Sequence, residues 1–177
     1  MGYGIITIDG KKISLTEMGV LHLSKHKDHG KRLHFIFEKV SALVQMHQPA
    51  AVALEAPFFG KNVQSMLKLG RAQGVAIAAA MAHGSPTTEY APRKVKQSIT
   101  GNGNASKEQV VKMLESILGF KNDGKFLDAT DALAVALCHH YEDTGLPQTR
   151  KATSGSSKKS SDTWARFVEE NPHKIKK

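Results

Sequence analysis

The alternation of apolar and polar positions predicts two strands and then a helix at the start of the chain. Residues 3–9 and 13–23 have the pattern of strands, and the Asp-Gly pair between them is typical of a tight hairpin. Apolar residues then recur at helical spacing through 28–47, and Pro49 ends that helix.

Strands and helices alternate in the next part of the chain. Residues 51–55 form an apolar run that ends in Glu55, as in a parallel strand covered on both faces. Asn62 is placed to cap a helix that continues to about residue 82, and 87–90 has the pattern of another strand. The remaining helices are expected at about 92–99, 106–118 and 128–141. This order is typical of a mixed α/β sheet, in which ligands bind at the carboxyl ends of the strands, where Glu55 lies.

The composition divides the chain into one folded domain at 1–143 and a basic tail at 144–177. Residues 151–162 are rich in Ser, Thr, Gly and Lys and contain no large apolar side chain, so we expect this stretch to be disordered. The net charge is +9, of which the tail carries +5 and the domain +4. A basic chain favours a polyanionic partner, but a basic tail also serves solubility, so charge alone does not establish nucleic-acid binding.

Other compositional features exclude whole classes of protein. The single cysteine, Cys138, rules out an intrachain disulfide framework and fits a reducing compartment. The start of the chain lacks the pattern of a signal peptide, and the longest run of small or apolar residues, 75–82, is too short to span a membrane. We therefore expect a cytoplasmic protein.

Three carboxylates are the candidate metal ligands. Glu55 ends an apolar strand, whereas Asp128 and Asp131 are three positions apart on a helix and so share a face. Carboxylates from separate elements are what a pair of magnesium ions needs for phosphodiester chemistry. The alternative for the two aspartates is helix capping, which satisfies free N–H groups and the helix dipole. Glu55 is harder to explain in structural terms, because a charge at the end of an apolar strand is costly unless it is paired or bound to metal.

Cations and aromatic residues surround the segments that carry these acids. Lys96 and Lys107 flank the flexible Gly/Asn loop 101–104, and Arg93 precedes it, which suits phosphate contact. The alternative is that these lysines make no phosphate contact and are simply solvated side chains on surface helices. The adjacent phenylalanines at 58 and 59 directly follow the strand that ends in Glu55, so they are placed either to stack on bases or to join the core.

The predicted helix 62–82 contains Gly70 and Gly74 one turn apart. Glycine inside a helix costs about 1 kcal/mol relative to alanine, so the pair indicates close approach of another backbone. That backbone belongs either to the sheet of the same chain or to a second copy of the helix in a dimer.

Taken together, several segments closely resemble the RuvC family of Holliday-junction resolvases. The similarity covers roughly residues 2–143, and it is carried by the segments 2–4, 55–62, 67–75, 90–97, 101–103, 107–110 and 128–136. The resemblance implies an RNase H-like mixed sheet flanked by helices. It also implies a homodimer, formed through the 62–82 helix, that nicks a four-way DNA junction symmetrically in recombination and repair.

The resemblance assigns roles to individual residues. It implies that the metal-binding catalytic acids are Glu55, Asp128 and Asp131, with two Mg²⁺ ions per site and Mn²⁺ as a possible substitute. The DNA-binding residues that it implies are Phe58, Lys61, Arg93, Lys96 and Lys107. The further partners implied are the branch-migration proteins of the same pathway.

One part of the family pattern does not occur in this sequence. The family has a central strand that ends in Asp-x-Gly about ten residues before Gly-Tyr-Gly, and its aspartate is a further metal ligand. Here Gly2-Tyr3-Gly4 directly follows Met1, and the Asp-Gly pair at 9 and 10 lies at the far end of the hairpin, so it is no substitute. We expect the first central strand to be missing from this chain, Met1 to be an internal methionine, and activity to be impaired. An upstream reading frame without such a strand would contradict this expectation.

Three functions compete at this point. The first is a junction-resolving endonuclease, the second is a non-catalytic module that binds junction DNA, and the third is an RNase H-like nuclease that acts on RNA–DNA hybrids. Cleavage of a synthetic junction in the presence of magnesium, compared with a hybrid duplex, distinguishes them.

Overall fold

The computed structural model describes residues 1–57, 62–121 and 127–144. In chain order the elements are β1 (Gly2–Asp9), β2 (Lys12–Val20), a 3-10 turn (Leu23–Lys25), α1 (His29–His47), β3 (Val52–Glu55), α2 (Val63–Ala82), β4 (Thr87–Tyr90), α3 (Pro92–Thr100), α4 (Lys107–Leu118) and α5 (Leu127–Asp143). The predicted elements are confirmed apart from their ends. The strand expected over 13–23 stops at Val20, because the chain turns there into the 3-10 segment.

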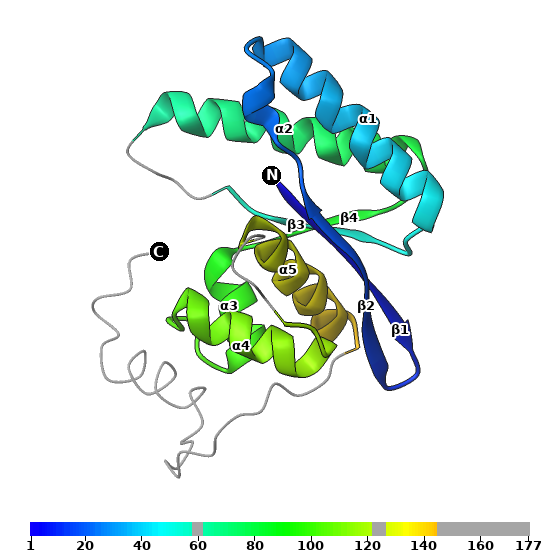
Figure 1. Ribbon diagram of the computed structural model, residues 1–177, viewed down its shortest axis with the longest axis vertical. Coiled ribbons are helices and arrows are strands. Elements are labelled where there is room, and N and C mark those ends of the chain that lie inside the picture. Colours follow the sequence, from blue (N-terminus) through cyan, green and yellow to red (C-terminus); the bar gives the residue numbers. More distant parts are fainter. Residues whose placement is uncertain (58–61, 122–126, 145–177) are drawn as a thin grey trace, which may run out of the picture.

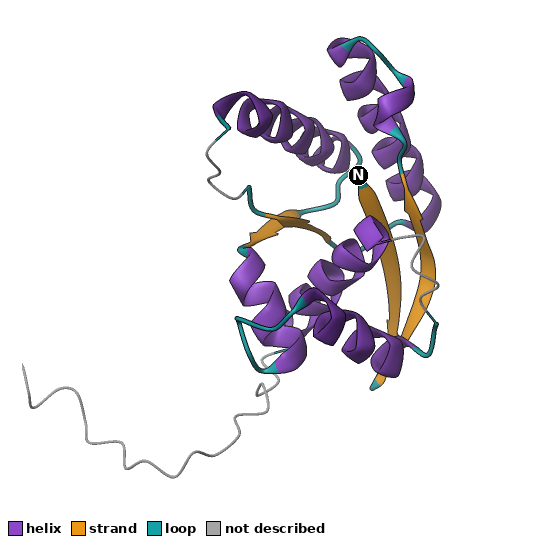
Figure 2. Ribbon diagram, turned by 60° about the vertical axis from the view of Figure 1, so that its left-hand side comes forward, coloured by secondary structure: helices purple, strands orange, loops and turns teal. Residues whose placement is uncertain are grey.

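The four described strands form two separate pairs. β1 and β2 make an antiparallel hairpin, whereas β3 and β4 are parallel neighbours, so the arrangement is mixed as expected. Figure 1 shows α1 and α2 on one side of the strands and α3, α4 and α5 on the other, and Figure 2 shows the two strand pairs apart from each other. Within the described residues β1 pairs only with β2, and β3 only with β4.

Each side of the strands has its own hydrophobic core. The larger core gathers the buried face of α5 with α3, α4 and the hairpin, and the smaller one lies under α1 and α2. Ala53 packs against the first core and Leu54 against the second. Since side chains alternate along a strand, Glu55 faces the α5 side.

The Gly-Tyr-Gly segment of β1 allows a close approach to α5. A Cβ atom at Gly2 would lie 1.9 Å from the main-chain oxygen of Asp128, and one at Gly4 would lie 2.6 Å from Cδ2 of Leu133. Any larger residue would therefore push the strand off the helix. This contact sets the position of the first turns of α5 relative to the hairpin.

Helices α1, α2 and α4 begin at side chains that accept hydrogen bonds from free N–H groups. Asp28 accepts from the amide of Lys31, and Asn62 accepts from the amide of Ser65. Ser106 and Gln109 form a reciprocal capping box at the start of α4. Among the described helices, none combines the length and apolar character needed to cross a membrane.

Candidate active site

Glu55 lies at the carboxyl end of β3, beside residues from α3, α4 and α5. Part of its side chain reaches solvent, yet burial is the main reason why the pKa of its carboxyl lies above the ordinary value. The negative charge of Asp131 raises this pKa further, and the positive charges of Lys107 and Lys96 oppose the shift. The fold therefore brings together two candidate acids and two candidate cations from four separate elements.

Lys107 and Asp131 form an ion pair within this group. The Nζ atom of Lys107 lies 2.7 Å from Oδ2 of Asp131, and each side chain is about half exposed. An exposed pair contributes at most about 1 kcal/mol to stability, so its main effect is on orientation. The capping box at Ser106 fixes the start of α4, and thereby places Lys107 over the first turns of α5.

Asp128 is oriented differently from Asp131. Within the described residues helix α5 begins at Leu127, so Asp128 lies in its first turn, where the helix dipole favours a carboxylate. Its carboxylate is exposed, and its Oδ2 atom lies 3.6 Å from the amino nitrogen of Met1. Asp128 belongs to the same end of α5 as Asp131, but it contacts the start of β1.

The side chains at this end of the sheet provide only some of the ligands that a divalent cation needs. The described residues contain no group of three Asp, Glu, His or Cys side chains arranged to hold an ion. Glu55 and Asp131, however, are close enough for one carboxylate to raise the pKa of the other. Magnesium commonly uses one or two carboxylates and completes its coordination with water and substrate phosphates. The two carboxylates therefore supply part of the ligand set that a divalent cation requires.

The remaining predicted DNA contacts divide into two groups. Arg93 is exposed at the start of α3, where a Cβ atom at Gly103 would lie only 2.7 Å from its Cγ atom. The glycine thus lets the 101–104 loop pack directly against the arginine side chain. Phe58 and Lys61 lie outside the described residues.

One residue of this region escaped the sequence analysis. Gln73 of α2 donates a hydrogen bond from its side-chain nitrogen to the main-chain oxygen of Glu55, at 3.3 Å, and another to the carboxylate of Glu89. The only sequence signal is a polar residue within a helix rich in small apolar ones, and that pattern does not name its partner.

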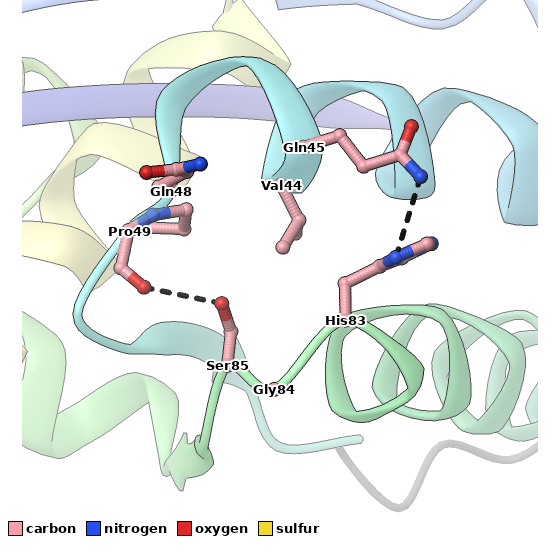
Figure 3. Close-up of a pocket in the computed structure, with 7 residues that line it drawn as sticks. All are labelled: Val44, Gln45, Gln48, Pro49, His83, Gly84 and Ser85. Carbon is pink, nitrogen blue, oxygen red and sulfur yellow. Dashed lines mark hydrogen bonds between the residues drawn. The ribbon is translucent and has the colours of Figure 1, made fainter.

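A hollow lies at the opposite end of the β3–β4 pair from Glu55. It measures about 400 Å³ and lies between the ends of α1 and α2 (Figure 3). The amide of Gln45 faces His83 at 3.4 Å, and the hydroxyl of Ser85 donates to the carbonyl of Pro49 at 3.1 Å. Its lining contains no carboxylate, and it adjoins the amino ends of the strands, so it is separate from Glu55.

Comparison with known proteins identifies close relatives along nearly the whole chain. Residues 1–139 match the family model described as crossover junction endodeoxyribonuclease RuvC. Proteins of that name from Cytophaga hutchinsonii and Christiangramia forsetii are 54% and 52% identical, over 99% of this chain and 82% and 87% of their own lengths. The corresponding protein of Porphyromonas gingivalis is 50% identical, over 99% of this chain and 91% of its own length.

Solved structures agree with the sequence relatives. Thermus thermophilus RuvC in complex with a Holliday junction substrate superimposes with a TM-score of 0.75 at 34% identity, covering 81% of this chain and 88% of that one. A second Thermus thermophilus RuvC structure gives 0.72 at 35% identity, covering 81% and 89%. The expected RNase H-like fold is thereby confirmed. The chain belongs to the RuvC family of crossover junction endodeoxyribonucleases.

Proposed function

We propose that this protein resolves four-way DNA junctions by paired, magnesium-dependent nicks during recombination and repair in the cytoplasm. The observation that carries the proposal is the meeting of Glu55 and Asp131 with Lys96 and Lys107 at the carboxyl end of β3. The Thermus thermophilus relative bound to a Holliday junction substrate supports the choice of junction DNA. Branch-migration proteins of the same pathway are the proposed further partners.

The side chains of the site have distinct roles in this proposal. Glu55, Asp131 and Asp128 hold the metal, which when bound supplies a Lewis acid that activates water and stabilises the leaving oxygen. Lys107 orients the Asp131 carboxylate through their ion pair. Lys96 and Arg93 face the DNA backbone, where cations contact phosphate oxygens independently of base sequence.

The exposed face of α2 supports a homodimer. A Cβ atom at Gly70 or Gly74 would have no described atom within 4 Å, apart from the helix's own backbone and the neighbouring residues, so neither glycine packs on the sheet. Val63 and Leu67 extend the same face and are more than half exposed. A second copy of the helix accounts both for the glycines and for the exposed apolar side chains.

The decisive experiment compares substrates and one variant. With Mg²⁺, the protein is expected to cut a synthetic four-way junction, more slowly than a relative that has the Asp-x-Gly aspartate, and to leave a linear duplex and an RNA–DNA hybrid intact. Glu55→Gln should lower the cleavage rate by at least about 100-fold, because a ligand that holds the metal becomes neutral. Junction binding without metal should change by less than about twofold, since DNA affinity comes mainly from the cations.

Other outcomes point to the competing functions. Tight junction binding without cleavage favours the non-catalytic module, and preferential cutting of the hybrid favours the RNase H-like alternative. Equal rates in the parent and in Glu55→Gln would remove Glu55 from the mechanism.

A further inference from the structure

The ends of β3 and β4 present two neighbouring side chains towards α5. Glu55 and Tyr90 are partners in the parallel register of these strands, and the amide of Ala56 donates to the carbonyl of Tyr90 at 2.8 Å. Partners in adjacent strands are about 5 Å apart and point to the same face of the sheet. Tyr90 packs against the larger core, which is the side that Glu55 also faces. The two side chains therefore approach α5 from adjacent points.

The Tyr90 ring reaches a later turn of α5 than the one that lies near Glu55. Its hydroxyl lies 2.9 Å from Nδ1 of His139, and the two rings meet edge to face with centroids 5.9 Å apart. Glu55 instead lies near Asp131, whose charge helps to raise the pKa of the Glu55 carboxyl. Asp131 and His139 are about two turns apart, which is roughly 12 Å along the helix axis, so they share a side of α5. The strand ends thus meet α5 at two separate places.

An ion pair adds a further link at the same end of α5. The Nζ atom of Lys94 on α3 lies 2.8 Å from Oε2 of Glu142, less than one turn beyond His139. Helix α3 begins at Pro92, directly after β4, so this link and the Tyr90–His139 contact join α5 to one continuous segment. Both side chains of the ion pair are partly exposed, so it contributes little energy by itself. The hydrogen bond of Tyr90 is therefore the more specific of the two.

The distance between the two candidate ligands depends on where α5 lies relative to β3. Glu55 belongs to the strand and Asp131 to the helix, so rotation or sliding of α5 changes their separation. Such a movement would also break the hydrogen bond between Tyr90 and His139, because its geometry tolerates only small displacements. Burial raises the pKa of Tyr90, so its hydroxyl stays protonated at neutral pH and remains available for this contact.

We propose that Tyr90 is a positioning residue of the cleavage site, which holds α5 through His139 so that Asp131 faces Glu55. This inference rests on the proposed function, because it takes these two carboxylates as metal ligands. A displacement of about 1 Å at a reacting group can slow a reaction by about 100-fold. Loss of one hydrogen bond permits a smaller displacement, and we expect an effect of about 10-fold.

The substitutions separate the hydrogen bond from the volume of the two rings. Tyr90→Phe keeps the ring without the hydroxyl, and His139→Leu keeps much of the volume without a polar atom. His139→Asn places an amide atom near the position of Nδ1, so it can still pair with Tyr90. Tyr141→Phe is the matched control, because it removes the same hydroxyl from another tyrosine that joins α5 to the core.

Four measurements are made on each variant. They are the carboxyl ¹³C chemical shift of Asp131 without metal, Mn²⁺ affinity by calorimetry, junction affinity without metal, and single-turnover cleavage with Mg²⁺. Thermal unfolding shows which variants are folded, and Tyr90→Phe decides the question if His139→Leu is not.

The expected pattern is specific to positioning. Tyr90→Phe and His139→Leu should each weaken Mn²⁺ binding and slow cleavage by about 10-fold, with junction affinity unchanged within about twofold. The double variant should be no worse than either single one, because both remove the same hydrogen bond. His139→Asn should recover most of the loss, and Tyr141→Phe should match the parent. The Asp131 signal should shift in Tyr90→Phe and not in Tyr141→Phe, although Asp131 is two turns away from the contact.

Other results would overturn the role of Tyr90. These are unchanged Mn²⁺ binding and cleavage in a folded Tyr90→Phe, additive losses in the double variant, or a His139→Asn variant no better than His139→Leu. In each case an active parent leaves the proposed function in place. A parent that neither binds Mn²⁺ nor cuts the junction contradicts the proposed function itself, and the role of Tyr90 falls with it.

Discussion

At the scale of single residues, the site is defined by charges that the fold places in unfavourable surroundings. Glu55 is partly shielded from water and lies near the negative Asp131, and both effects raise the pKa of its carboxyl. Lys107 offsets part of this cost through its ion pair with Asp131. A bound dication would remove the remaining repulsion, because it attracts both carboxylates.

The raised pKa gives Glu55 a pH dependence of definite sign. The folded protein holds the Glu55 proton more tightly than the unfolded chain does, so the stabilisation is present below the ordinary carboxyl pKa and is lost as pH rises through the raised value. Glu55→Gln should therefore increase the free energy of unfolding at pH 7, by less than about 1 kcal/mol because the side chain is partly exposed.

Metal affinity should increase as pH rises, since the Glu55 carboxyl has to be ionised to bind the ion. This sign is opposite to that of the pH dependence of stability. Asp131→Asn should lower the pKa of Glu55, because it removes a neighbouring negative charge. Carboxyl ¹³C chemical shifts followed against pH measure this directly. A Glu55 pKa that does not move in Asp131→Asn would contradict the proximity of the two side chains.

At the scale of elements, two pairs of glycines have opposite roles. Those at the start of β1 permit contact with α5, whereas Gly70 and Gly74 lie on an open helix face. The sequence alone offered both packing on the sheet and a dimer for the second pair. The choice between the sheet and a dimer depends on which atoms surround the helix. The spacing of residues in the sequence carries no information about those atoms.

Alanine substitutions at these glycines should shift stability in opposite directions. Gly4→Ala should lower the free energy of unfolding by about 1–3 kcal/mol, since the new methyl group would overlap the Leu133 side chain. Gly70→Ala should raise it by about 0.5–1 kcal/mol in the monomer, because alanine is the better helix former and nothing described obstructs its methyl group. Denaturant unfolding at low protein concentration measures both.

Self-association provides the second measurement for α2. Gly70→Leu should weaken a dimer by separating the two helices, whereas Gly4→Ala should leave the dissociation constant of the folded protein unchanged. Sedimentation at several concentrations compares them. An equally strong dimer in Gly70→Leu would place the dimer interface elsewhere.

At the scale of the whole molecule, the fold separates the charged side chains of the candidate site from those of α1. The acids and the cations Lys96 and Lys107 gather at the carboxyl end of β3, while α1 and its lysines lie on the other side of the strands (Figure 1). The proposed DNA surface is therefore the one formed by α3, α4 and α5. Charge on α1 contributes to the net charge but lies away from this surface.

This arrangement predicts how junction binding responds to salt. Without metal, Lys96→Ala should weaken binding and reduce the slope of log affinity against log salt by about one, as expected for the loss of one phosphate contact. Lys31→Ala is the matched control, because Lys31 is exposed in the first turn of α1. It should leave the slope unchanged within error, and equal effects of the two substitutions would contradict the assignment of the DNA surface.

The sequence by itself determined the features that depend on local interactions. The start of α2 at Asn62, the start of α4 at Ser106 and the end of β3 at Glu55 follow from capping chemistry and hydrophobic periodicity within a few residues. The family resemblance added the RNase H-like fold, which the solved structures confirm. Only the tertiary structure decided that Lys107 pairs with Asp131, that the Gln73 side chain donates to the Glu55 carbonyl, and that the described strands form two separate pairs. Such contacts join residues far apart in the chain, and they exist only once the helices have packed on both sides of the strands.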